Sequence, residues 1–116
     1  MAITKHTLTE NVSYKLVKYD GIETQVEALL ESMNAEIPIT LATSREVAAQ
    51  RWAGSDFPPD FQAYTSYLGN KQGVDILLLM QGNLGSIYLR AENAGFAARM
   101  PEVESRIEQI LNYKPQ

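Results

Sequence analysis

The chain of 116 residues contains no cysteine and a single histidine, His6. Without cysteine it forms no disulfide, holds no thiolate-bound metal and has no cysteine nucleophile. His6 lies in a polar N-terminal stretch, whereas catalytic groups are held on rigid elements, so we expect neither a catalytic triad nor a histidine metal site. The sequence therefore predicts no metal, no other cofactor and no catalytic residue.

Long apolar runs and an excess of positive charge are also absent. The longest apolar run, Ile76–Met80, is far shorter than the roughly 20 residues of a membrane span. The N-terminus lacks the apolar segment of a secretion signal. The net charge of −4 argues against extended contact with phosphates. We therefore expect a cytoplasmic protein that binds neither membranes nor nucleic acid.

The overall composition is that of one folded domain. Hydrophobic residues make up 45% of the chain and charged residues 21%, values that are ordinary for a globular protein. The length is close to the commonest domain size. We therefore expect a single domain over residues 1–116, with residues 1–10 as a polar and flexible lead-in.

Periodicity predicts the secondary structure. Apolar alternation or short apolar runs bounded by turn residues predict strands at residues 11–19, 36–42, 73–80 and 86–92. Apolar stripes and capping signals predict helices at residues 22–33, 43–53, 61–68 and 100–113. The resulting fold class is α+β, with the order β-α-β-α-α-β-β-α and a mostly antiparallel four-stranded sheet packed with helices.

Two of these helices have clear apolar stripes. The stripe of the first helix consists of Ile22, Val26, Leu29, Leu30 and Met33, and that of the last helix of Val103, Ile107, Ile110 and Leu111. On the other side of the first helix, Glu23, Glu27 and Glu31 form an acidic ridge, which is either a solvated face or a docking surface.

The apolar hairpin between Ile76 and Leu89 motivates a prediction about assembly. Its strands read as buried on both faces, and the helices of one chain offer limited cover. We therefore expect a homodimer that buries the second face of the sheet.

The segment Ser44–Tyr64 contains the single tryptophan, Trp52, and a Pro58-Pro59 pair. It reads as two short helices joined at a corner. Its aromatic residues either pack beneath the corner or form an exposed anchor for a partner, because Trp, Tyr and Arg are frequent at interface hot spots.

Polar residues near this corner suggest an alternative, a small-molecule site or an acid/base enzyme in a cavity between sheet and helices. Asp56 and Asp60 flank Phe57, although both also suit turn and helix-cap roles. Thr43, Ser44 and Arg45 open a predicted helix where a small anion is able to bind, although Thr43 with Glu46 also forms a capping box.

The sequence thus favours a small non-catalytic interaction or accessory module that pairs with itself or with another protein. The candidate binding residues are Arg45, Arg51, Trp52, Asp56, Phe57, Asp60, Tyr64 and Arg90.

Overall fold

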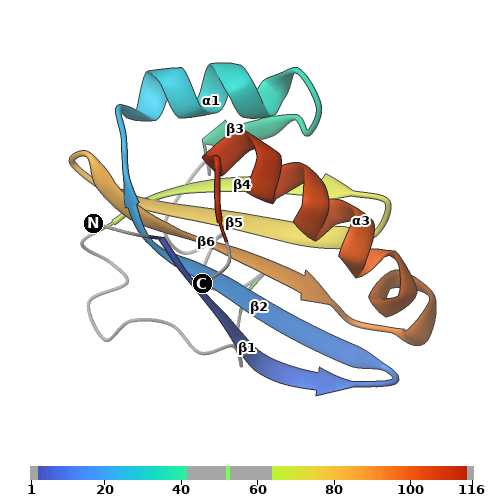
Figure 1. The fold of residues 1–116 in the computed structure, drawn as a ribbon. Coiled ribbons are helices and arrows are strands. Elements are labelled where there is room, and N and C mark those ends of the chain that lie inside the picture. The colour runs from blue at the N-terminus through green and yellow to red at the C-terminus, as the bar shows by residue number, and fades with distance from the viewer. Residues whose placement is uncertain (1–2, 42–51, 53–63, 115–116) are drawn as a thin grey trace.

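One antiparallel sheet organises the protein. The computed structural model describes residues 3–41, 52 and 64–114, and within them six strands pair in the order β1-β2-β6-β5-β4-β3 (Figure 1). The strands are β1 (Thr4–Asn11), β2 (Tyr14–Glu23), β3 (Ile39–Leu41), β4 (Thr65–Lys71), β5 (Val74–Gln81) and β6 (Leu84–Ala91). Two helices in the described residues, α1 (Val26–Asn34) and α3 (Ala94–Leu111), lie on the same side of the sheet.

The α+β class is confirmed, but the predicted four-stranded sheet and the order β-α-β-α-α-β-β-α are wrong. The described residues follow the order β-β-α-β-β-β-β-α. The predicted helix at residues 43–53 lies outside the described residues, except for Trp52.

Strand β1 was not predicted because it occupies the edge of the sheet. Almost all of its side chains are exposed, so its sequence shows no apolar alternation. The register against β2 shifts between Thr7 and Thr9, which inserts a bulge into the edge. Such bulges reduce the ability of an edge strand to pair with another sheet.

Residues 65–68 were predicted to be helical and instead begin strand β4. The apolar spacing that suggested a helix also fits a strand, because Ser66 is buried against one face and Tyr67 packs in the core of the other. The turn to β5 fixes this register. Gln72 and Gly73 both have positive φ, 54° and 88°, as a tight two-residue hairpin requires. A Cβ atom at position 73 would collide with the ring of Phe96, so the position also needs glycine for space.

The first helix is shorter than the predicted helix 22–33. Ile22 and Glu23 extend β2, and the helix begins at Val26. Strand β2 continues past Asp20 because Gly21 adopts a positive φ of 78° within a register shift between Tyr19 and Ile22. The Asp20-Gly21 pair, a sequence that normally ends a strand, forms a bulge within β2.

The last helix starts earlier than predicted. Asn93 caps α3 by accepting a hydrogen bond from the Phe96 amide at 2.9 Å, and Pro101 lies inside the helix rather than in its first turn. No helix in the described ranges is long and apolar enough to cross a membrane.

Both faces of the central strands are buried within one chain. The face beneath α1 and α3, called here the helix-covered face, holds an aliphatic core that includes Val17, Ile76, Leu78, Ile87 and Leu89. The opposite face holds a smaller cluster of Leu16, Trp52, Leu77, Leu79 and Tyr88. The hairpin of β5 and β6 is confirmed, and its strands are buried on both sides.

This burial removes the reason for expecting a dimer. The expectation assumed that one chain covers the hairpin incompletely, and that assumption is wrong. The homodimer itself stays a prediction.

Candidate functional site

Three of the residues proposed from sequence lie in the described part of the chain, and all three belong to the opposite face. Trp52 is in its apolar cluster, Tyr64 packs against that cluster, and Arg90 lies against Trp52. The remaining candidates fall outside the described residues: Arg45, Arg51, Asp56, Phe57, Asp60 and the predicted anion site Thr43, Ser44 and Arg45.

Trp52 and Arg90 form a buried contact. The Arg90 guanidinium lies 4.2 Å from the centroid of the Trp52 ring, and the two residues are 0% and 4% exposed. Arg90 also pairs with Asp75 at 3.3 Å, and the Asn70 amide donates to the same carboxylate at 3.0 Å. Such a desolvated stack of cation and ring holds the opposite face together. Trp52 is therefore a core residue, and it does not present an exposed anchor.

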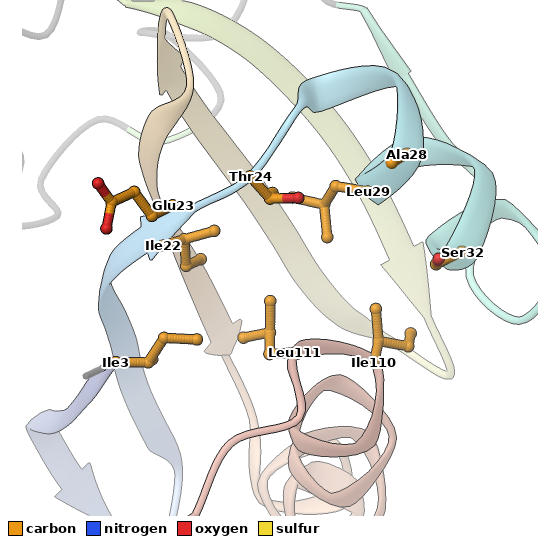
Figure 2. A pocket seen from close by; sticks show the side chains of 9 residues that line it. All are labelled: Ile3, Ile22, Glu23, Thr24, Ala28, Leu29, Ser32, Ile110 and Leu111. Carbon is orange, nitrogen blue, oxygen red and sulfur yellow. The ribbon is translucent and has the colours of Figure 1, made fainter. Parts of the chain in front are cut away.

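A pocket that is open to solvent, unlike the Trp52–Arg90 contact, lies on the helix-covered face between α1, the end of β2 and the C-terminal end of α3 (Figure 2). We call it the interhelical pocket. Ile22, Leu29 and Leu111 direct their side chains toward a common space, joined by Ile3 and Ile110 from its other sides. Thr24, Ala28 and Ser32 complete the lining, together with Glu23, whose carboxylate points away from the apolar side chains.

The size of the interhelical pocket limits its occupant. Its volume is about 230 Å³. Ligand clefts for drug-sized molecules usually span about 300–1,000 Å³. An engineered apolar cavity of about 150 Å³ binds benzene. The interhelical pocket therefore has room for one aliphatic or aromatic group.

A second pocket lies at the end of β2 and of the β5–β6 hairpin, with a volume of about 370 Å³. We call it the Asp20 pocket. Asp20, Ser86 and Tyr64 contribute polar groups, and Leu84 contributes an apolar wall. Asp20 follows Tyr19, and Ser86 precedes Ile87, both of which belong to the helix-covered core. Since side chains alternate along a strand, Asp20 and Ser86 point to the opposite face.

A charged network joins α3 to β1 and β2. Glu108 accepts hydrogen bonds from the Tyr19 hydroxyl at 2.6 Å and from the Lys5 ammonium at 2.8 Å. Burial raises the pKa of Glu108, but these two bonds and the Lys5 charge outweigh burial, so the pKa lies below its ordinary value of 4.5. Burial and the neighbouring Glu108 raise the pKa of Tyr19.

The same network includes a second acid of α3, Glu104. Glu104 pairs with Lys15 at 3.4 Å and with Lys5 at 3.7 Å, so each acid already has a basic neighbour. Within the described ranges, no three His, Asp or Glu side chains gather as a metal site would require.

Part of the lining of the interhelical pocket was predictable from the sequence. Ile22 and Leu29 belong to the stripe expected for the first helix, and Ile110 and Leu111 to that of the last helix. A stripe identifies which side chains face inward, but it does not tell whether two stripes meet completely or leave a gap. Ile3 was overlooked because it precedes the unrecognised strand β1.

No protein-family model, curated protein or solved structure matches this chain.

Proposed function

We propose that this protein is a small non-catalytic interaction module that receives one apolar side chain of a protein partner in the interhelical pocket. The observation that supports the proposal is an open space between two helices that Ile22, Leu29 and Leu111 face, with Thr24 and Ser32 as polar parts of its lining. Grooves of this kind, with a few apolar walls and a polar rim, suit side-chain anchors.

The volume of the interhelical pocket and the partial exposure of its apolar walls favour an amino-acid side chain over a free metabolite as the occupant. About 230 Å³ is too small for most drug-sized ligands, whereas one Leu, Phe or Trp side chain matches the space. Ile3, Ile110 and Leu111 are only partly buried, so a bound group removes their exposed apolar surface from water.

The charge near the pocket suggests the character of the partner. Glu27 and Glu31 are exposed on α1, next to the pocket residues Ala28 and Ser32 in sequence, and the chain carries a net charge of −4. Opposite charges at the rim of an interface accelerate association and select partners. We therefore expect an apolar anchor flanked by basic residues.

The lining does not favour the alternative of acid/base chemistry. Of the polar groups considered for catalysis, Tyr64 and Arg90 are described, and neither lines the interhelical pocket. Arg90 is already engaged by Trp52 and Asp75. The polar residues that line this pocket among those described are Glu23, Thr24 and Ser32, of which one is an acid and none is a base.

The first test uses indole, the free equivalent of a Trp side chain, followed by NMR of methyl groups. We expect saturable shifts of the Ile22, Leu29 and Leu111 methyl signals, because these groups form the walls. The Ala28→Trp variant places its own ring at the pocket and should abolish the shifts. Glu27→Trp is the matched control, because position 27 lies on the same helix and does not line the pocket.

The second test asks for a protein partner. A photo-crosslinking residue at Ser32 should give a discrete adduct in native lysate, lost in Ala28→Trp and retained in Gln109→Trp, which adds a ring at an exposed, uncharged position of α3 outside the pocket lining. The same residue at the exposed Glu102 of α3 controls for nonspecific capture. Equal adducts from positions 32 and 102, or indole shifts that survive Ala28→Trp, would contradict the proposal.

A further inference from the structure

The Asp20 pocket contains a carboxylate that two hydrogen bonds hold at one oxygen and that faces the Lys18 ammonium at 3.8 Å with the other. Oδ1 of Asp20 accepts hydrogen bonds from the Ser86 hydroxyl at 2.8 Å and from the Gly21 amide at 3.0 Å. The nearest cation to Oδ2 is the Lys18 ammonium at 3.8 Å, which is beyond hydrogen-bond length. Among the described residues, no group donates a hydrogen bond to Oδ2.

The backbone explains why this carboxylate is fixed. Gly21 lies inside the β2 bulge with a positive φ of 78°, and its amide donates to the side chain of the preceding Asp20. Ser86 is 8% exposed and lies on β6, the central neighbour of β2. Two rigid elements therefore orient one acceptor before any ligand arrives, which lowers the entropic cost of binding.

The rest of the pocket suits an apolar stem. Leu84 is 51% exposed at the tip of the β5–β6 hairpin, although its side chain is apolar. Tyr64 offers a partly buried ring, and Gln81 carries a side-chain carbonyl that can accept a further hydrogen bond. The volume of about 370 Å³ falls in the range of small-ligand sites.

We propose that the Asp20 pocket binds a guanidinium or primary ammonium group carried on a short apolar stem. Oδ2 of Asp20 accepts hydrogen bonds from the cation, and Leu84 and Tyr64 contact the stem. This site shares Ile22 with the lining of the interhelical pocket, but it does not depend on the function proposed for that pocket.

The electrostatic setting agrees with a cationic ligand. Burial raises the pKa of Asp20, but hydrogen bonds from Ser86 and Gly21 and the positive Lys18 and His6 outweigh burial, so the pKa lies below its ordinary value of 3.8. The carboxylate is thus ionised at neutral pH. The net charge of −4 attracts cations at longer range. Lys18 competes for Oδ2, and its ammonium is also held over the Tyr88 ring at 5.4 Å.

The test compares n-butylguanidinium with N-butylurea, a neutral molecule of nearly the same shape, by NMR titration of backbone amides. We expect saturable shifts at Gly21, Leu84 and Ser86 with the cation and none with the urea. Asp20→Asn keeps an acceptor for Ser86 and Gly21 but removes the charge, so we expect at least about tenfold weaker binding. Glu31→Gln removes one charge elsewhere and should leave the affinity unchanged.

A pair of capped tripeptides identifies the source of the cation. One contains arginine and the other citrulline, its neutral counterpart. Binding of the arginine peptide at least about tenfold tighter than that of butylguanidinium points to a partner protein, whereas equal binding points to a free small cation. Both outcomes support the site.

Equal shifts with butylguanidinium and N-butylurea would overturn the proposal, as would unchanged affinity in Asp20→Asn. If Asp20→Asn does not fold, Leu84→Ala replaces it, because Leu84 is exposed and its truncation spares the core. We expect several-fold weaker binding in Leu84→Ala, and an unchanged affinity there would also overturn the proposal.

Discussion

The two faces of the central strands are equally buried but differ in chemistry. The helix-covered face is almost entirely aliphatic, with Ile76, Leu78 and Leu89 beneath α1 and α3. The opposite face combines Leu77 and Leu79 with aromatic rings and charged groups, among them Arg90. Ionic groups are buried on both faces: Glu104 of α3 is 7% exposed and pairs with Lys15 beside the helix-covered face, whereas Arg90 lies against the rings of the opposite face.

The opposite face shows how the charged side chain of Arg90 is accommodated in a buried layer. Arg90 is 4% exposed, and its charge is balanced by Asp75 and by the Trp52 ring. An uncompensated charge at that depth would be strongly destabilising. Aliphatic packing beneath the helices and charges that are paired wherever they are buried therefore leave the central strands covered on both sides.

The largest expected effect is that of removing the aromatic cover from the opposite face. Trp52→Ala should lower the free energy of unfolding by about 3–5 kcal/mol, because a fully buried ring is lost and Arg90 loses its contact. Urea unfolding followed by circular dichroism measures the change. A loss below about 1 kcal/mol would show that Trp52 is not a core residue.

The neighbours Leu77 and Leu78 compare the two faces directly, because both are 0% exposed and point to opposite sides of β5. We expect Leu77→Ala and Leu78→Ala each to cost about 2–5 kcal/mol. Parallel urea titrations test this expectation. If Leu77→Ala were nearly neutral while Leu78→Ala was not, the opposite face would be poorly packed.

Each face also has one carboxylate that can be compared by its pH dependence. The pKa of Glu108 is lowered by Lys5 and Tyr19, and that of Asp20 by Ser86 and Gly21, despite burial in both cases. A lowered pKa stabilises the fold above the ordinary pKa, and this stability is lost as the pH falls through the folded-state pKa.

At pH 7 we therefore expect Glu108→Gln to cost about 0.5–1.5 kcal/mol and the more exposed Asp20→Asn about 0.5 kcal/mol. Both differences from wild type should shrink as the pH falls below 4. Unfolding experiments between pH 2 and 7 test the sign; a difference that grows toward low pH would contradict it.

The smallest effect is expected from protein concentration. If the opposite face needed a second subunit, the thermal midpoint would rise with concentration. Since one chain buries both faces, we expect a constant midpoint for a monomer, whereas a homodimer formed through any surface would raise the midpoint with concentration because it dissociates on unfolding. Sedimentation tests the predicted homodimer directly, with a mass of 13.0 kDa for a monomer. A midpoint that rises with concentration would show that folded chains associate, and a rise that Trp52→Ala removes would assign the contact to the opposite face.

Secondary structure was predictable where burial is one-sided or complete. The run Ile76–Met80 is apolar throughout and lies in a strand buried on both faces, and Leu29 and Met33 mark the inner side of α1. Strand β1 and the start of β4 escaped prediction for a physical reason. An edge strand such as β1 does not need an apolar face. The short mixture of Tyr, Thr, Ser and Leu at the start of β4 has an apolar spacing that fits both a helix and a strand.

The sites were less predictable than the fold. Asp20 reads in sequence as half of a turn signal, and only the bulge at Gly21 and the nearness of Ser86 make it an oriented acceptor. Trp52 and Arg90 were both noticed in sequence, but their residue types do not tell that they stack on each other.

By itself, the sequence determined the α+β class, the buried hairpin and the lack of thiol chemistry, since these follow from local periodicity and composition. Tertiary structure decided the number of strands, the core position of Trp52 and the two pockets. Those features depend on residues far apart in the chain coming together, such as Ile22 and Leu111, which line one pocket, and Asp20 and Ser86, which share a hydrogen bond. Local patterns do not specify which distant residues meet.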